Sequence, residues 1–333
     1  MKLKNIALIG MIGLGGVWCH YRNKKYPLAK GYGILNKIII PGGVLNVPVA
    51  KFANRILSKE KLLKSSNGVI RNRIEINTRD GKQIELSIYK PNDIECNNPC
   101  LIYFHGGGFF LKDESYIHNI VCEYAKNVKC CVVFVHYRTA DEYPYPVPFQ
   151  DCCDAIRYVW ENSENLGIDK NRIALGGDSA GGALTGACTL WCRDETNIRI
   201  CFQMLIYPVT DLRMKTETAK KYVDAPLWNS TLSKKMWEIY LRNGIPDIKE
   251  YASPALAKNF FDLPPAYIEV SEFDSLRDEG VAYATALKEA GVNVQCDEIK
   301  GACHGFDVFL NNELTIKAIQ KRSKVLIDAF NNQ

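Results

Sequence analysis

The chain has 333 residues, of which 47% are hydrophobic and 24% are charged. This composition is typical of an ordinary globular protein, and it excludes intrinsic disorder, collagen-like repeats and a polytopic membrane protein. The length suits one large domain, or one domain with a lid.

The net charge of +5 is unevenly placed along the chain. Residues 1–64 contain twelve Lys or Arg residues and one acidic residue, whereas the remainder contains 30 basic and 36 acidic residues. Because the body of the protein is slightly acidic, the sequence argues against a general nucleic-acid binder.

An apolar run at residues 6–18 follows Lys2 and Lys4, as in a signal peptide. No small-x-small cleavage site follows it, and it is short for a membrane span, which needs roughly 20 residues. We predict that residues 1–19 are an apolar leader or membrane anchor, with membrane-surface contact through residues 1–30. The positive charge after the run would keep the rest of the chain cytoplasmic. A packed or flexible leader and a cleaved signal are the alternatives.

The 13 cysteines are an odd number, and none of their spacings is that of a zinc finger or a small disulfide framework. We expect buried, reduced thiols that act as small hydrophobic side chains. This expectation fits a reducing compartment.

Short β-branched runs alternate with helical stretches from about residue 69 onward. Strands are predicted at residues 70–76, 84–89, 100–104, 131–135, 172–175, 201–207, 266–270 and 292–298, and helices near 115–127, 148–162, 180–192, 275–290 and 314–330. The alternation predicts an α/β fold with a mainly parallel sheet covered on both faces. The first two strands flank a turn signal, so they would add an antiparallel hairpin at one edge.

Two stretches interrupt this alternation. They are the basic segment at residues 20–64 and the long connection at about residues 211–255. Connections of that length are usually functional, so we expect the two to form a helical cap over the C-terminal ends of the strands. The main α/β domain would then occupy residues 65–333 with the second stretch as an insertion. An ordinary surface excursion is the alternative.

The motif GDSAGG at residues 177–182 lies directly after a predicted strand and before a helix-prone run. That context is required for a nucleophile elbow, in which glycines allow a tight turn and the central Ser179 is presented above the sheet. We expect Asp178 to be a structural brace of the elbow.

A second motif, HGGG at residues 105–108, also follows a strand. Glycines leave backbone N–H groups unobstructed, so the N–H groups of Gly106 and Gly107 could form an oxyanion hole with that of Ala180. A flexible turn is the alternative reading of three glycines.

The base is identified by elimination among His20, His105, His118, His136 and His304. The first lies in the leader, the second in the glycine loop, the third on a predicted helix and the fourth at the end of a strand. His304 alone follows both the nucleophile and a plausible acid, in a loop after the last strand.

That acid is Asp274, which follows the predicted strand at residues 266–270. The C-terminal end of a strand is where such a sheet places its site residues. Asp278, Glu279 and Glu272 are rivals. The chain order of nucleophile, acid and base is that of α/β-hydrolases.

Over about residues 65–330 the sequence resembles the hormone-sensitive-lipase-like branch of the α/β-hydrolases, whose esterases have an HGGG loop and a GDSAGG elbow. Residues 137–151 resemble the YRLAPE segment of that family, with departures at Thr139 and Asp141, and Ser275 stands where Pro is usual. The resemblance implies an α/β-hydrolase fold with a mostly parallel eight-stranded sheet, flanking helices and a helical cap.

The predicted function is hydrolysis of small to medium apolar acyl esters through an acyl-enzyme on Ser179, with no metal or organic cofactor. The expected partner is a small ester, with no nucleic acid. Trp228, Trp237 and Tyr240 suggest an apolar acyl or alcohol pocket, although core packing also explains them. The alternatives are a deacetylase or amidase of a small acylated metabolite and, from another class, a non-catalytic small-molecule receptor.

Overall fold

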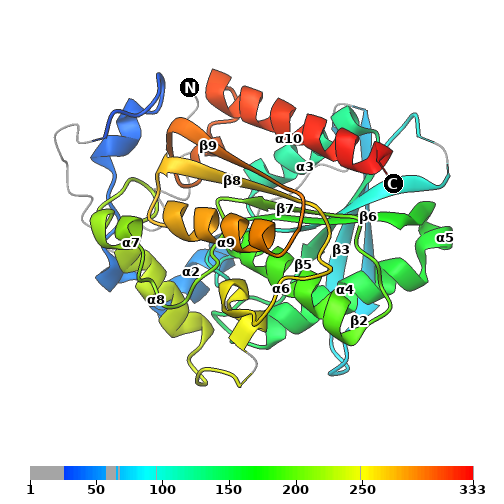
Figure 1. Ribbon diagram of the computed structural model, residues 1–333, viewed down its shortest axis with the longest axis horizontal. Helices are drawn as coiled ribbons and strands as arrows, with labels where there is room; N and C mark the ends of the chain where they lie inside the picture. The colour runs from blue at the N-terminus through cyan, green and yellow to red at the C-terminus, as the bar shows by residue number, and fades with distance from the viewer. Residues whose placement is uncertain (1–25, 58–64, 67, 95, 248, 333) are drawn as a thin grey trace.

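The computed structural model describes residues 26–57, 65–66, 68–94, 96–247 and 249–332, so the predicted leader at 1–19 lies outside the described residues. One sheet runs through the middle of the molecule (Figure 1). Its described strands are β1 (Ser65–Ser66), β2 (Val69–Asn77), β3 (Gln83–Pro91), β4 (Asn98–Phe104), β5 (Cys131–His136), β6 (Ile168–Asp178), β7 (Phe202–Ile206), β8 (Ala266–Phe273) and β9 (Val294–Cys303). They lie in the order β1-β2-β3-β5-β4-β6-β7-β8-β9.

The sheet is mixed but mostly parallel. Strands β1, β2, β3 and β5 pair antiparallel in that order, and every pair from β5–β4 to β8–β9 is parallel. The eight strands β2–β9 are those of the predicted fold, and β1 adds a two-residue strand beside β2. The predicted α/β sheet with an antiparallel hairpin near one edge is therefore confirmed.

The helices cover both faces of this sheet. They are α2 (Val47–Leu57), α3 (Ser115–Val128), α4 (Val147–Glu161), α5 (Ser163–Leu166), α6 (Ala180–Glu195), α7 (Glu217–Lys221), α8 (Ser230–Tyr240), α9 (Arg277–Glu289) and α10 (Glu313–Asn331), with 3₁₀ turns η2 (Gly33–Lys37), η3 (Gly42–Val44), η4 (Lys249–Tyr251), η5 (Pro254–Leu256) and η6 (Phe306–Val308). Side chains of α3 and α10 join one hydrophobic cluster, and those of α4, α6 and α9 join another. Figure 1 shows these two layers above and below the sheet.

Position in the sheet explains the sequence pattern of each strand. Near the edge, β2 carries exposed residues along much of its length, whereas every residue of β7, in the interior, is buried. A strand covered on both faces reads as a continuous apolar run, which is why the central strands were recognisable in the sequence.

The two stretches that interrupt the alternation contact each other. Asn229 Nδ2 donates a hydrogen bond to the carbonyl oxygen of Ile40 at 3.0 Å, and the N–H of Gly42 donates to Thr231 Oγ1 at 3.1 Å. Residues before the sheet therefore pack on the insertion between β7 and β8. No described helix is both long and apolar enough to cross a membrane.

All twelve cysteines in the described part of the chain are free thiols, and nine of them are buried. Burial raises the pKa of Cys303, so its uncharged form is favoured. The nine buried thiols pack as small hydrophobic side chains, as the sequence predicted.

Candidate active site

Ser179 lies in the turn between β6 and α6, with a backbone φ of 54° that is strained for a residue with a side chain. The flanking glycines make this turn possible. A Cβ atom on Gly181 would lie 1.9 Å from the carbonyl oxygen of Phe104, and one on Gly177 would lie 2.6 Å from the same atom. Only glycine fits at both places, so the elbow can press against β4.

The structure brings Ser179, His304 and Asp274 into one hydrogen-bonded line. His304 Nε2 lies 2.9 Å from Ser179 Oγ, and its Nδ1 lies 2.7 Å from Asp274 Oδ2. Asp274 is fully buried, and its other oxygen accepts the N–H of Leu276 at 2.9 Å. The carboxylate thus holds the imidazole with Nδ1 protonated and Nε2 free to accept the serine proton.

The three rival carboxylates are engaged elsewhere. Glu279 accepts the N–H of Thr210 at 2.7 Å, Glu272 accepts the N–H of Gly301 at 2.7 Å, and Asp278 pairs with the arginine that precedes it. Burial raises the pKa of Glu279 well above its usual value. Each therefore has a local role that explains its presence beside Asp274 in the sequence.

The remaining described histidines lie outside this line, and His20 lies outside the described residues. His118 Nε2 and His136 Nδ1 both contact the carboxylate of Asp113, at 2.6 and 3.1 Å. His105 is buried behind the glycine loop, where burial lowers its pKa to about 4, so its ring is neutral at physiological pH.

Gly106 does not supply a donor to the site. Its N–H donates to Asp178 Oδ1 at 3.1 Å, and the same oxygen accepts the hydroxyl of Tyr103 at 3.0 Å. This contact contradicts the predicted oxyanion role of Gly106. Asp178 is the brace that the sequence suggested, and burial together with the nearby charge of Asp307 raises its pKa to about 7.

The N–H groups of Gly107 and Gly108 are oriented by hydrogen bonds that the carbonyl oxygens of the same two peptide groups accept. The carbonyl of Gly106 accepts His105 Nδ1–H at 2.7 Å, and the carbonyl of Gly107 accepts the N–H of Leu111 at 2.9 Å. In a trans peptide the N–H points away from the carbonyl, so the N–H groups of Gly107 and Gly108 face the other way. Both residues line the cavity that contains Ser179.

A third N–H follows the same rule. The carbonyl of Ser179 accepts the N–H of Val209 at 3.0 Å, so the N–H of Ala180 on that peptide points in the opposite direction. Because α6 begins at Ala180, this N–H also has no acceptor within the helix. Sequence reasoning missed Gly108, although the third glycine of the HGGG motif was available as a signal.

The cavity above Ser179 has a volume of about 90 Å³ and is mainly apolar. Its hydrophobic lining includes Ile40, Leu111, Ile117, Leu227, Trp228 and Val308. The Trp228 ring lies 5.9 Å from that of His304, whereas Trp237 and Tyr240 pack on Phe109 in the core. Of the three aromatic residues named from the sequence, one lines the cavity and two serve packing.

Within the part of the chain that the structure describes, no group of three or more His, Cys, Asp or Glu side chains could hold a metal ion. The chemistry that this arrangement supports directly is nucleophilic attack by Ser179 with proton transfer through His304.

Comparison with known proteins agrees with the fold and the motifs. A family model described as an alpha/beta hydrolase fold matches residues 101–308. The chain is 37% identical over 214 residues to esterase LipI of Mycobacterium tuberculosis, which covers 62% of this chain and 65% of LipI. It is 34% identical to carboxylesterase NlhH of the same species, over 67% of this chain and 71% of NlhH.

Solved structures show the same likeness. A bacterial heroin esterase superposes with a TM-score of 0.77 at 31% identity, covering 84% of this chain and 89% of the esterase. Esterase LipW from Mycobacterium marinum superposes with a TM-score of 0.83 at 26% identity, covering 91% and 96%. The chain therefore belongs to the α/β-hydrolase family, and its relatives place it among the carboxylesterases.

Proposed function

We propose that this protein hydrolyses small carboxylic esters with a short apolar acyl group through an acyl-enzyme on Ser179. One observation carries the proposal. A buried Ser–His–Asp line opens into an apolar cavity that also contains backbone N–H donors. Nucleophile, base and oxyanion donors then surround one point, which ester hydrolysis requires.

In the first half of the reaction, Ser179 Oγ attacks the ester carbonyl while His304 Nε2 takes the hydroxyl proton. Asp274 stabilises the imidazolium cation. The N–H groups of Gly107, Gly108 and Ala180 stabilise the tetrahedral oxyanion, and each such donor typically contributes about 3 kcal/mol. His304 returns the proton to the departing alcohol.

In the second half, a water molecule attacks the acyl-enzyme, and His304 acts as base once more. The free acid then leaves, and Ser179 regains its proton. Apart from the ester and water, both halves use only residues of this chain.

The cavity volume supports a short acyl group. A cavity of about 90 Å³ with a mainly apolar lining favours an acyl group of few carbon atoms over a long chain. We therefore expect the short end of the small-to-medium range predicted from the sequence, acetate through butyrate. A relative named ethyl acetate hydrolase, from Pseudomonas putida, is 31% identical over 237 residues.

The test is a series of p-nitrophenyl acetate, butyrate and octanoate esters. We expect kcat/KM to fall at least tenfold from butyrate to octanoate, and Trp228→Ala to reduce that difference by opening the cavity. Replacing Ser179 with Ala should lower kcat by at least about 10⁴-fold. Unchanged hydrolysis by that variant would reject the assignment.

We also propose that residues 20–64 and 211–255 together form a cap, and that residues 1–30 contact an anionic membrane surface with the catalytic domain on the cytoplasmic side. The hydrogen bond between Asn229 and Ile40 supports the cap, and the net charge of +11 in residues 1–64 supports the membrane contact. Cosedimentation with phosphatidylserine vesicles, with and without residues 1–25, tests the latter. Equal binding would contradict it.

A further inference from the structure

Asn54 is a buried side chain of α2 that lies outside the region matched by the family model. It binds the loop after the HGGG motif at two points. Its Nδ2 donates to the carbonyl oxygen of Phe110 at 2.8 Å, and its Oδ1 accepts the N–H of Lys112 at 2.8 Å. One amide thus fixes the backbone on both sides of Leu111.

These two bonds lead directly to a proposed oxyanion donor. The N–H of Leu111 donates to the carbonyl of Gly107 at 2.9 Å, and that of Phe110 donates to it at 3.2 Å. The carbonyl of Gly107 and the N–H of Gly108 belong to the same planar peptide. The residues that Asn54 holds therefore set the direction in which the Gly108 N–H points.

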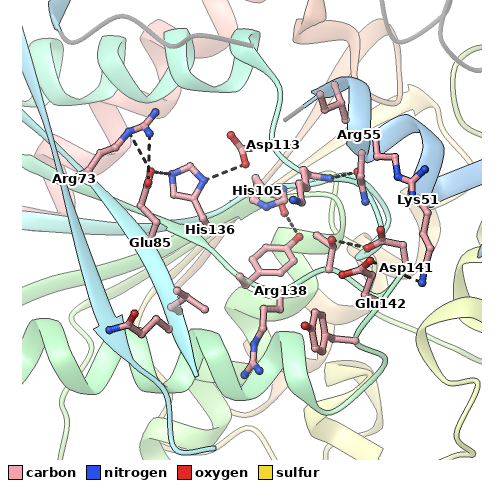
Figure 2. A pocket seen from close by; sticks show the side chains of 18 of the residues that line it. Lys51, Arg55, Arg73, Glu85, His105, Asp113, His136, Arg138, Asp141 and Glu142 are labelled. Atoms are coloured by element: carbon pink, nitrogen blue, oxygen red, sulfur yellow. Dashed lines mark hydrogen bonds and ion pairs between the residues drawn. The ribbon is translucent and has the colours of Figure 1, made fainter. Parts of the chain in front are cut away.

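The loop has this restraint at the point where its close packing ends, because Phe110 and Leu111 are buried whereas Lys112 is exposed. It borders a polar cavity of about 560 Å³, whose wall includes Asn54, His105, Lys112 and Asp113. Figure 2 shows this cavity, with His105, Asp113 and His136 from the core on one side and residues of α2 on the other. Behind Lys112, hydrogen bonds rather than close packing hold the backbone in place.

The loop is also held at its two ends. The N–H of Ala140 donates to the carbonyl of Phe109 at 2.7 Å, and Asp113 is held by His118 and His136. Both of these ties come from the catalytic core. Asn54 holds the stretch between them and comes from the N-terminal segment.

We propose that Asn54 is a positioning residue for the oxyanion hole, acting through residues 110–112 on the Gly108 N–H. This inference rests on the proposed ester hydrolysis at Ser179. Without the two hydrogen bonds from Asn54, the loop relaxes toward the polar cavity. Because the oxyanion forms in the transition state, kcat falls while KM stays nearly constant.

The experiment compares Asn54→Ala with wild type on p-nitrophenyl acetate, using the full chain. We expect kcat to fall about 10- to 100-fold and KM to change less than threefold, since a displacement of about 1 Å at a reacting centre costs on the order of 100-fold. A kcat within twofold of wild type would overturn the inference.

Asn46→Ala is the matched control. Asn46 lies just before α2, where its Oδ1 accepts the N–H of Val49 at 3.0 Å, so its loss weakens the same helix without touching the loop. We expect its kcat to stay within twofold of wild type. If both variants lower kcat equally, helix stability rather than positioning explains the effect, and the inference is overturned.

A second variant covers the case in which Asn54→Ala does not fold, which a thermal melt reveals. Asn54→Asp has the same shape and keeps the acceptor for Lys112, but in its ionised form, which an assay at alkaline pH favours, it cannot donate to the Phe110 carbonyl. It should lower kcat at least tenfold, and unchanged kcat would overturn the inference. An inactive wild-type enzyme would instead reject the proposed function, and this inference with it.

Discussion

Two Ser–His–Asp arrays in this molecule share a hydrogen-bond pattern but differ in their surroundings. In the first, His304 joins Ser179 and Asp274 at 2.9 and 2.7 Å. In the second, His136 Nε2 lies 2.8 Å from Ser87 Oγ, and its Nδ1 lies 3.1 Å from Asp113 Oδ1. Distances alone do not distinguish them.

The surroundings of the two serines distinguish the two arrays. Ser87 is fully buried in the middle of β3, and Arg71 donates to its Oγ from Nε and Nη2 at 3.2 and 2.9 Å. The lone pairs that would attack a substrate are thus occupied. Ser179 instead lies on a strained turn in a cavity with oriented N–H donors. A nucleophile needs access and an oxyanion site as well as a base.

The sharpest test of this difference is covalent labelling. A fluorophosphonate reacts with a serine that a base activates, so we expect Ser179 to be modified and Ser87 to stay unmodified. Peptide mass mapping locates the adduct. Ser179→Ala should abolish labelling, and an adduct on Ser87 would show that the buried array is reactive.

The strained turn itself can be broken. Gly181→Ala places a Cβ 1.9 Å from the Phe104 carbonyl oxygen, so β6, α6 or the glycine loop must shift. We expect a loss of more than about 4 kcal/mol in the free energy of unfolding, measured by urea denaturation.

Gly43→Ala is the control, because nothing lies within 4 Å of the added atom there. Its stability should stay within about 0.5 kcal/mol of wild type. Equal losses in the two variants would mean that the elbow does not depend on close packing.

Much of the Ser179–His304–Asp274 array was predictable from the sequence because the signals for it are local motifs. The GDSAGG and HGGG motifs each follow an apolar strand, and the chain order of Ser179, Asp274 and His304 pointed to the three side chains that the structure brings into contact. The central strands were predictable for a similar reason, since burial on both faces leaves a continuous apolar run.

The parts that sequence could not supply depend on contacts between distant segments. The choice between Gly106 and Gly108 as a donor depends on Asp178, which takes the Gly106 N–H from 72 residues away in the chain. Asn54 lies 56 residues from the carbonyl that it binds. No local periodicity encodes either contact.

The two carboxyl groups beside the glycine loop, Asp178 and Asp113, have pKa values shifted in opposite directions. The stability of the protein should therefore depend on pH in a way that can be measured. Burial raises the pKa of Asp178 to about 7, where its partners are neutral donors. Burial also acts against ionisation of Asp113, but the nearby His136 and His118 lower its pKa well below the usual value.

Proton linkage decides whether the contribution of Asp178 to stability rises or falls with pH. Between about pH 4 and pH 7 the unfolded chain loses this proton while the folded chain keeps it, so its contribution to stability falls as pH rises. The loss in the free energy of unfolding from this one group over that pH range is on the order of 4 kcal/mol. Asp178→Asn keeps an acceptor for both donors, so its unfolding free energy should fall less than that of wild type from pH 4 to pH 8. Parallel curves in urea titrations would contradict the raised pKa.

The smallest effect is expected for a substitution in the Ser87–His136–Asp113 array. Ser87→Ala leaves Arg71 without the hydroxyl oxygen that accepts two of its N–H bonds, and His136 loses a partner as well. A buried donor left without its acceptor costs about 1–3 kcal/mol, so the melting temperature should fall by a few degrees. Hydrolysis of p-nitrophenyl acetate should stay within threefold of wild type, because Ser87 touches neither the cavity above Ser179 nor its N–H donors. A tenfold loss of kcat at unchanged KM would instead mean that the Ser87–His136–Asp113 array holds the glycine loop in its catalytic position.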